Sequence, residues 1–437
     1  MTRWLDRFFR LSLHGTTLRG EFVAGLTTFF TMSYIVAVNP AILKTAGIPA
    51  DASLTATILT AIFGTLLMAF YANRPFAVAP YMGENAFIAF TVVHVLRYSW
   101  QRALGAVFVA GILFILMTML RLRQWMVEAI PPTLRYSYAV GIGLFLTFIG
   151  LNQTGIVTIG SPGAPVRPGH LTSASVLLAV FGFLLITVLS IRRFPAAILA
   201  GILATAILSF VTGISPPPAS WVGFPPSLRP VLFQLDLHGV FSWAFLPVVL
   251  TILVMAFVDT MGTLIGVSAR AGFLDKDGNL PQMDRPMMAD ALATTFAALI
   301  GTTTSGAFIE SATGVEAGGR TGLTSAVTAI CFAGTLFFAP FISVIPPLAY
   351  GPALIFVGLL MLTPITRVPF DDLSEVVPAF GVIALMAFTY NVGIGMTAGF
   401  VLYPLCKLFA GRMREVRPAL LVLTALSALF FVFYPYS

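Results

Sequence analysis

Residues Gly301 to Leu323 read GTTTSGAFIESATGVEAGGRTGL, and this stretch decides how the chain folds. It lies among apolar segments long enough to cross a bilayer, yet it holds two glutamates and, before Arg320, six Thr or Ser hydroxyls. A carboxyl group inside a membrane protein is costly and normally faces the bundle interior or a watered cavity. Glu310 is therefore the first candidate for a functional group.

The composition before Glu310 predicts a break in the helix at this point. The small and β-branched residues from Thr302 to Phe308 favour an extended lead, and a short helix is expected to start near Glu310. Backbone N–H groups at a helix start carry partial positive charge and form a polar ligand site at membrane depth. The stretch thus predicts a binding site inside the membrane.

The rest of the chain is an integral membrane protein by composition. Of its 437 residues 58% are hydrophobic and 9% are charged, and the mean hydropathy is +0.95. Soluble domains carry about 25% charged residues. Spans of about 20 residues with short loops give about a dozen or more crossings in one bundle, an all-α polytopic fold.

The net charge of +7 comes from arginines whose positions indicate membrane topology rather than a surface for nucleic acid. Arginines precede the first span, flank a loop and cluster late, at Arg3, Arg7, Arg10, Arg19, Arg121, Arg123, Arg135, Arg412, Arg414 and Arg417. Phe22 to Leu43 lacks a signal-peptide cleavage pattern and is expected to remain as the first span. No nucleic acid is expected as a partner, and the bilayer is.

Apolar runs of about spanning length fall into two sets of seven. The first set lies within residues 1–213, a Pro-rich connector covers 214–240, and the second set lies within 241–410. An odd number of crossings per half inverts the second half, as in many secondary transporters. Residues 411–437 form an extra apolar segment, and Leu420 to Tyr436 is either a fifteenth crossing or a helix in the membrane interface.

The two halves are similar at their third runs. AVAPYMGENAFIAF (Ala77 to Phe90) and TTTSGAFIESATGV (Thr302 to Val315) each have a broken extended lead, a Glu followed by Asn or Ser, and a short apolar helix. Paired interrupted segments at matching positions indicate a binding site at the membrane midplane.

Asp259 is a second candidate, since it is the only ionisable residue between His238 and Arg270. A central Asp in a span costs about 2.5 to 3.5 kcal/mol even on low estimates, which favours a functional role. Thr263 lies one turn further on the same helix face and could bind the same ligand. Together with Glu310, Asp259 suits a ligand rich in N–H donors, and also proton coupling, because low dielectric favours the neutral carboxyl group.

Glu84 and Asn85 begin the matching helix of the first half but point about 100° apart. Asn85 offers a donor and an acceptor together, whereas Glu84 is either a site residue or a structural one. Glu316 is expected to pair with Arg320 at the helix end. Asn39, in the first span, is a weaker site candidate, because polar residues in helical bundles often serve only as interhelical hydrogen bonds.

The sequence also speaks against several other classes of protein. The four histidines form no HExxH spacing, and no GxxxxGK[ST] phosphate loop occurs. A membrane metalloprotease, an ATP-driven pump or another enzyme is therefore not expected, and neither is a cofactor or metal.

Six strings resemble the nucleobase/cation symporter-2 family, specifically its hypoxanthine/guanine/adenine permease branch, in the wider group of xanthine and uracil permeases. They cover nearly the whole chain in family order: AGLTTFFTMSYIVAVNPAIL (24–43), APYMGENAF (79–87), FVDTMGTLIGV (257–267), GTTTSGAFIESATGVEAGGRTGLTS (301–325), GPALIFVG (351–358) and VPAFGVIALMAFTYNVGIGMTAGFVLYPLCKL (377–408). The chain departs from the branch at Glu84, where an apolar residue is common, and in the hairpin YNVGIG.

The resemblance implies fourteen segments in two inverted repeats, with short strands in segments 3 and 10. A core domain would come from 20–120 and 241–343, and a gate domain from 133–213 and 349–410. Asp259 and Glu310 match the family's acidic substrate-binding positions, and Asn85 matches its polar position in segment 3.

The resulting hypothesis is a secondary active importer of purine nucleobases in the cell inner (plasma) membrane. Proton coupling through Glu310 and Asp259 is expected, with sodium as the other candidate ion. An anion exchanger on the same architecture is the alternative, although acids beside the site would repel an anion. The preferred purine and a homodimeric state are left open by the sequence.

Overall fold

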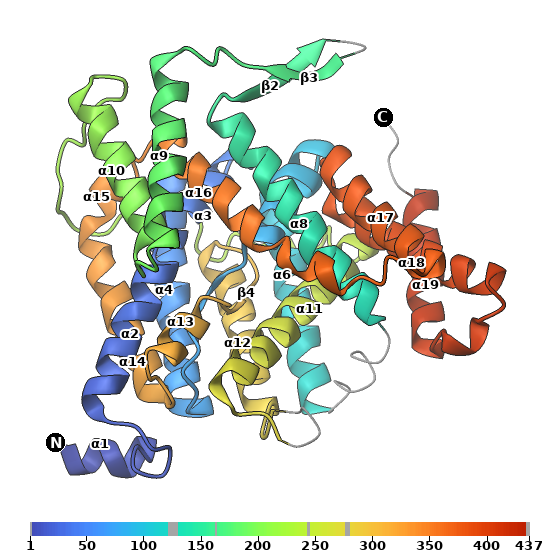
Figure 1. The fold of residues 1–437 in the computed structure, drawn as a ribbon, viewed down its shortest axis with the longest axis horizontal. Coiled ribbons are helices and arrows are strands. Elements are labelled where there is room, and N and C mark those ends of the chain that lie inside the picture. The colour runs from blue at the N-terminus through green and yellow to red at the C-terminus, as the bar shows by residue number, and fades with distance from the viewer. Residues whose placement is uncertain (1, 121–129, 162–163, 243–244, 276–279, 434–437) are drawn as a thin grey trace.

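The computed structural model describes residues 2–120, 130–161, 164–242, 245–275 and 280–433. Arg121 and Arg123, which the sequence analysis used as topology signals, lie outside the described residues. Figure 1 shows helices packed side by side, with the N-terminus and α1 at the lower end and the β2–β3 hairpin at the upper end.

The first part of the chain alternates long helices with one short strand and a hairpin. Its elements are α1 (Thr2–Phe9), α2 (Leu18–Met32), α3 (Ile35–Thr45), α4 (Ala50–Leu67), the π-helical η1 (Met68–Ala72), β1 (Val78–Pro80), α5 (Met82–Ala86), the π-helical η2 (Phe87–Val95), α6 (Trp100–Met119), α8 (Pro132–Gln153), β2 (Val157–Ser161), β3 (Ala164–Pro168), α9 (Ala174–Ile191) and α10 (Ala197–Val211).

The second part also alternates helices with a short strand, has no hairpin among its described residues, and ends on an additional helix. Its elements are α11 (Leu246–Ala271), α12 (Asp284–Ile300), β4 (Ser305–Ala307), α13 (Ser311–Glu316), α14 (Gly322–Thr335), the 3-10 turn η3 (Leu336–Phe338), α15 (Ala339–Ile342), α16 (Pro347–Leu360), η4 (Thr363–Arg367), α17 (Leu373–Phe388), α18 (Val392–Phe409), η5 (Met413–Glu415) and α19 (Pro418–Phe433).

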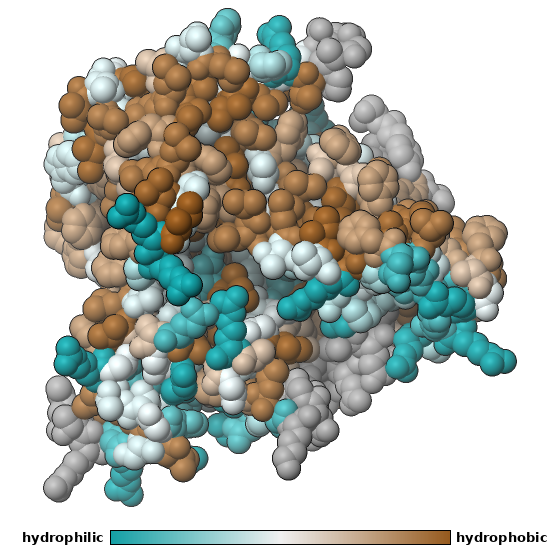
Figure 2. Space-filling view, in the orientation of Figure 1, coloured by the Kyte–Doolittle hydropathy of each residue, from teal (hydrophilic) through white to brown (hydrophobic). Residues whose placement is uncertain are grey.

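The fold is that of a polytopic helical membrane protein. Among the described residues, nine helices are long and apolar enough to cross a membrane, and four shorter apolar helices add to them. Apolar side chains dominate the upper part of the face in Figure 2, whereas hydrophilic ones gather along its lower and right-hand edges. Large side chains such as Phe181, Leu184 and Phe380 are exposed on this bundle, as expected where lipid replaces water.

The two extended leads predicted from the sequence are present, and they pair with each other. β1 and β4 form an antiparallel two-stranded sheet in which Val78 lies opposite Ala307, Ala79 opposite Gly306 and Pro80 opposite Ser305. All six residues are buried. Backbone N–H and C=O groups at membrane depth must find hydrogen-bond partners within the protein. The β1–β4 pairing supplies partners for some of the groups that the two helix breaks leave without one.

A threonine from a neighbouring helix satisfies further backbone groups of each strand. Thr65 of α4 accepts a hydrogen bond from Val78 N–H (2.9 Å) and donates to Val78 C=O (3.2 Å). Thr294 of α12 does the same for Ser305, at 3.1 and 2.7 Å. The same arrangement therefore occurs in both parts of the chain, one on each strand.

The partner of Glu316 differs from the one predicted from the sequence. Glu316 binds Arg270 of α11 at 3.0 Å, and the Arg320 guanidinium donates to the Val315 and Gly319 carbonyls. The predicted Glu316–Arg320 pair is therefore wrong, because Arg320 turns back onto carbonyls at and just after the end of the preceding helix α13. The segment around Leu420 is helical as α19 and packs on α18.

Glu21 is a fully buried acid that the sequence analysis did not single out. Its carboxylate caps the start of α14, accepting from the N–H groups of Arg320 (2.9 Å), Thr321 (3.3 Å) and Thr324 (3.0 Å). The Thr324 hydroxyl donates to it as well, at 2.6 Å. Glu21 thus joins α2 to α14 across nearly 300 positions in the chain.

We expect replacement of the Glu21 cap to cause a large loss of stability. Glu21→Ala leaves buried donors without an acceptor, which should lower the free energy of unfolding by at least about 3 kcal/mol. Glu316→Ala is the matched control, because its pair with Arg270 is exposed and such pairs contribute little. Thermal unfolding of the purified protein in detergent would measure both, and equal melting temperatures for the two variants would contradict the assignment.

Candidate functional site

The strand pair places two helix starts at the centre of the molecule. α5 follows β1 directly and carries Glu84 and Asn85, while α13 follows β4 and begins after Glu310. α11, which carries Asp259 and Thr263, packs against β4, α13 and α5. The structure thus brings the predicted site residues to one region from three separate parts of the sequence.

One face of α11 is open although its other faces are packed. Asp259, Thr263 and Gly266 are half-buried and Gly262 is exposed, at a spacing that defines a single helix face. A Cβ atom at Gly262 would meet nothing within 4 Å. Asp259 and Thr263 therefore lie on the open face of α11.

Glu310 and its neighbours form the adjacent wall of this space. Glu310 is half-buried and Ile309 is 52% exposed, with the Ile309 Cδ1 atom 3.5 Å from the Cβ position of Gly266. The Tyr34 hydroxyl, at the junction of α2 and α3, donates to Glu310 Oε1 at 2.5 Å. This charge-assisted hydrogen bond fixes one carboxylate oxygen and leaves the other available.

Asn85 lies in a buried hydrogen-bond network and not on the open face. Its amide donates to Asn39 Oδ1 and accepts from the Thr303 hydroxyl. Asn39 in turn donates to the hydroxyls of Thr57 (2.7 Å) and Thr302 (3.0 Å). Asn39 thus forms interhelical hydrogen bonds, and the network connects α3, α4 and α5 to the lead of β4.

Glu84 is fully buried behind the open face. Both of its carboxylate oxygens lack a hydrogen-bond partner among the described residues. The Asp259 carboxyl group is an ionisable side chain that interacts with it. Glu84 therefore sits close to the site without direct access to the open space.

Sequence reasoning missed Asp290 and Tyr81, which lie just behind the strand pair. Asp290 of α12 is fully buried, and its Oδ2 atom accepts from Ala307 N–H at 3.0 Å while its Oδ1 atom has no partner within the described part of the chain. The Tyr81 hydroxyl lies 3.1 Å from that of Thr260. The argument used for Asp259, a single acid in an apolar run, applies equally to Asp290 and would have found it.

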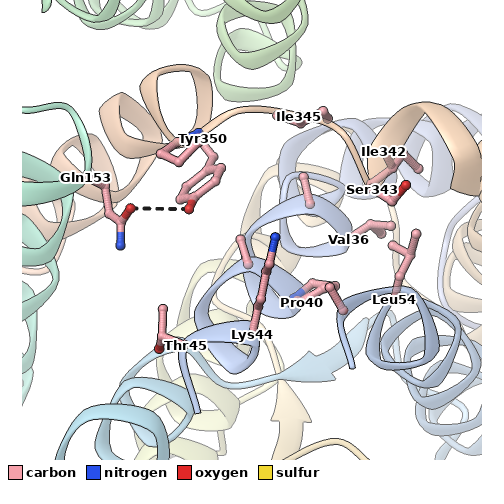
Figure 3. Close-up of a pocket in the computed structure, with 14 residues that line it drawn as sticks. Val36, Pro40, Lys44, Thr45, Leu54, Gln153, Ile342, Ser343, Ile345 and Tyr350 are labelled. Carbon is pink, nitrogen blue, oxygen red and sulfur yellow. Dashed lines mark hydrogen bonds between the residues drawn. The ribbon is translucent and has the colours of Figure 1, made fainter. Parts of the chain in front are cut away.

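A separate cavity of about 390 Å³ lies away from these acids. It is bounded by α3, α4, α15, α16 and the end of α8, and Figure 3 shows Lys44 pointing into it beside the Tyr350–Gln153 hydrogen bond. It contains none of the predicted site residues. No cluster of three or more His, Cys, Asp or Glu side chains fit to hold a metal ion occurs in the described residues.

Comparison with known proteins shows the family of the chain. The profile described as "Permease family", that of the xanthine/uracil permeases, matches residues 19–402. The adenine permease AdeP of Escherichia coli is 40% identical over 98% of this chain and 96% of its own. The guanine/hypoxanthine permease PbuG of Bacillus subtilis is 38% identical over 98% of this chain and 100% of its own.

Solved structures share the fold at low identity. The transmembrane domain of the cyanobacterial bicarbonate transporter BicA gives a TM-score of 0.63 at 18% identity, covering 87% of this chain and 97% of that one. The murine anion transporter Slc26a9 in its inward-facing state gives 0.59 at 12% identity, covering 90% and 69%. The chain belongs to the xanthine/uracil permease family and is a multi-pass membrane permease.

Proposed function

We propose that this permease is a secondary active transporter that imports purine nucleobases by proton symport with alternating access. The observation that carries the proposal is the pair of half-buried acids, Asp259 and Glu310, on adjacent walls of one opening beside the strand pair. Relatives that match almost the whole chain are named as adenine and guanine/hypoxanthine permeases. Sodium is the alternative coupling ion.

The chemistry of the opening suits a purine base. Carboxylates accept hydrogen bonds only, and a base presents ring N–H groups and, in adenine and guanine, an exocyclic amine. Asp259 and Glu310 would each accept from such groups, with the Thr263 hydroxyl able to serve a ring nitrogen or carbonyl. The flat faces of the base would lie against apolar neighbours such as Ile309.

In this proposal Asn85 acts on the binding site indirectly. Its amide is occupied by Asn39 and Thr303 in this conformation, so contact with a ligand requires that network to open. In its present state Asn85 would hold α5 and the lead of β4 together. It would thereby set the separation of the two walls of the site.

The contacts between helices support a division into the proposed core and gate domains. α2, α4 and α6 pack chiefly with α11 to α14, and α8 to α10 pack chiefly with α16 and α17. These groups correspond to a core from 20–120 and 241–343 and a gate from 133–213 and 349–410. Fourteen segments in two inverted halves, 1–213 and 241–410 joined by the connector 214–240, would supply these domains, and rocking of the core against the gate would expose the site alternately.

Anion exchange is the second candidate, and the fold favours it as much as nucleobase transport. BicA and Slc26a9 are named as transporters of bicarbonate and of anions, and they share the architecture. Asp259 and Glu310 argue against an anion, since two negative groups in a low-dielectric site would repel it.

Uptake of labelled purines into proteoliposomes tests the proposal. With an inward proton gradient we expect accumulation of hypoxanthine, guanine or adenine, and Asp259→Asn or Glu310→Gln should lower kcat/KM by roughly 10- to 100-fold by removing a charged acceptor. Glu316→Gln, an exposed acid on the same helix as Glu310, is the control. Uptake of bicarbonate or sulfate with no uptake of any base would contradict the proposal. A Glu310→Gln variant that still accumulates base against a gradient would show that Glu310 takes no part in proton coupling.

Tyr34 offers a test of how Glu310 is positioned. Tyr34→Phe removes one donor to the Glu310 carboxylate and should raise KM for the base by roughly 3- to 10-fold, with a smaller effect on kcat. Tyr138→Phe is the matched control, since Tyr138 is also buried and its hydroxyl makes only a long contact, 3.5 Å, with Met396 C=O. Equal KM values for the two variants would mean that the Tyr34–Glu310 bond does not shape the site.

A further inference from the structure

The proposed binding site does not explain why the Glu84 carboxyl group is buried. It is 0% exposed, and neither oxygen has a hydrogen-bond partner in the part of the chain that the structure describes. An ionised carboxylate without partners in a membrane interior is strongly unfavourable. Something other than the described side chains must neutralise it.

The groups that face Glu84 offer no positive charge. Asp259 of α11 and Tyr81, just before α5, are the ionisable groups of the described residues that interact with it. α8 presents Ile142 against the neighbouring Gly83, and α3 presents the Asn39 amide to Asn85. The ionisable groups that act on Glu84 among the described residues are therefore an acid and a phenol, and its neighbours Gly83 and Asn85 contact an apolar side chain and an occupied amide.

Glu84 and Asp259 differ in access although they are neighbours. Asp259 is half-buried on the open face of α11, while Glu84 lies fully buried behind it. Two carboxyl groups in contact at low dielectric cannot both ionise cheaply, and they share a proton, as carboxyl pairs in enzymes do. Only Asp259 can exchange that proton with the open space or accept a hydrogen bond from a ligand.

We propose that Glu84 and Asp259 form a proton-sharing pair in which Glu84 holds the symported proton while Asp259 binds the ligand. This assignment rests on the proposed function and deepens it. When a base donates an N–H group to Asp259, the Asp259 carboxylate is stabilised and the single proton of the pair stays on Glu84.

Release reverses this order. As the base leaves, water reaches Asp259, the O–H bond on Glu84 breaks, and the proton passes to an Asp259 oxygen and then to water. One proton thus enters and leaves with each base, and Glu84 returns to sharing the next proton. Glu310, held by Tyr34, contributes to binding the base in this scheme.

The transport test compares gradient-driven accumulation with counterflow exchange in proteoliposomes. With a pH gradient of about one unit, one coupled proton supports about tenfold accumulation of base by the wild type. Glu84→Gln has the same size but cannot hold the proton, so its accumulation ratio should fall to about 1 and its counterflow should lose its pH dependence. Glu316→Gln should behave as the wild type in both assays.

Two transport results would overturn the assignment. One is a Glu84→Gln variant that accumulates base to the wild-type level under the pH gradient. The other is wild-type accumulation that follows a sodium gradient and ignores the proton gradient, which would make the carried ion sodium.

Infrared spectroscopy tests the pair without any ligand, so its result is independent of what the protein transports. The purified wild type should show the carbonyl band of a protonated carboxyl group that shifts in Asp259→Asn, loses intensity in Glu84→Gln and is unchanged in Glu316→Gln. If Glu84→Gln does not fold, the wild-type band and its shift in Asp259→Asn carry the test. The proton-sharing pair would be contradicted if the wild type lacked such a band, or if neither substitution changed the band. Wild-type protein that takes up no base would contradict only the proposed function.

Discussion

The pairing of β1 with β4 is the interaction on which the rest of this structure depends. Two helices are broken inside the membrane, and each break leaves backbone N–H and C=O groups that lipid cannot satisfy. Antiparallel pairing of Val78–Pro80 with Ser305–Ala307, together with the hydroxyls of Thr65 and Thr294, satisfies groups on both strands. Because the two leads meet, the residues that follow them, Glu84 and Glu310, come to one place from opposite halves of the chain.

The charges of the site follow from the same geometry. Asp259 on the unbroken helix α11 faces the opening, Glu310 is held by Tyr34 on the next wall, and Glu84 lies behind Asp259. Carboxyl groups that have no basic partner among the described residues favour a ligand that brings N–H donors, and they favour a proton as the ion that balances the remaining charge. Substrate binding and coupling would in this way use the same small set of acids.

Sequence patterns predicted the features that depend on local composition. The helix breaks before Glu84 and Glu310, the location of most spans and the isolated acid at Asp259 could be read from residue types alone. The same reading overlooked Asp290 because its run also contains ordinary helix-forming residues, although an acid among MMADALATTF carries the same signal. It assigned Glu316 to the nearby Arg320, whereas the partner is Arg270, 46 positions away.

Long-range partners explain what the sequence could not predict. Tyr34 and Glu310 are 276 positions apart, and Glu21 caps a helix about 300 positions further along the chain. The burial of Asn85 in a network with Asn39 and Thr303 likewise depends on how three segments meet. No spacing rule within one helix contains that information, so these roles appear only with the fold.

The most direct measurement of the central claim is an experimental structure of the protein with a transported purine bound. The account predicts that the base lies in the opening beside β1 and β4, with N–H groups within about 3 Å of Asp259 and Glu310. A base bound instead in the cavity beside Lys44 and Tyr350, with Asp259 and Glu310 free of contact, would contradict it.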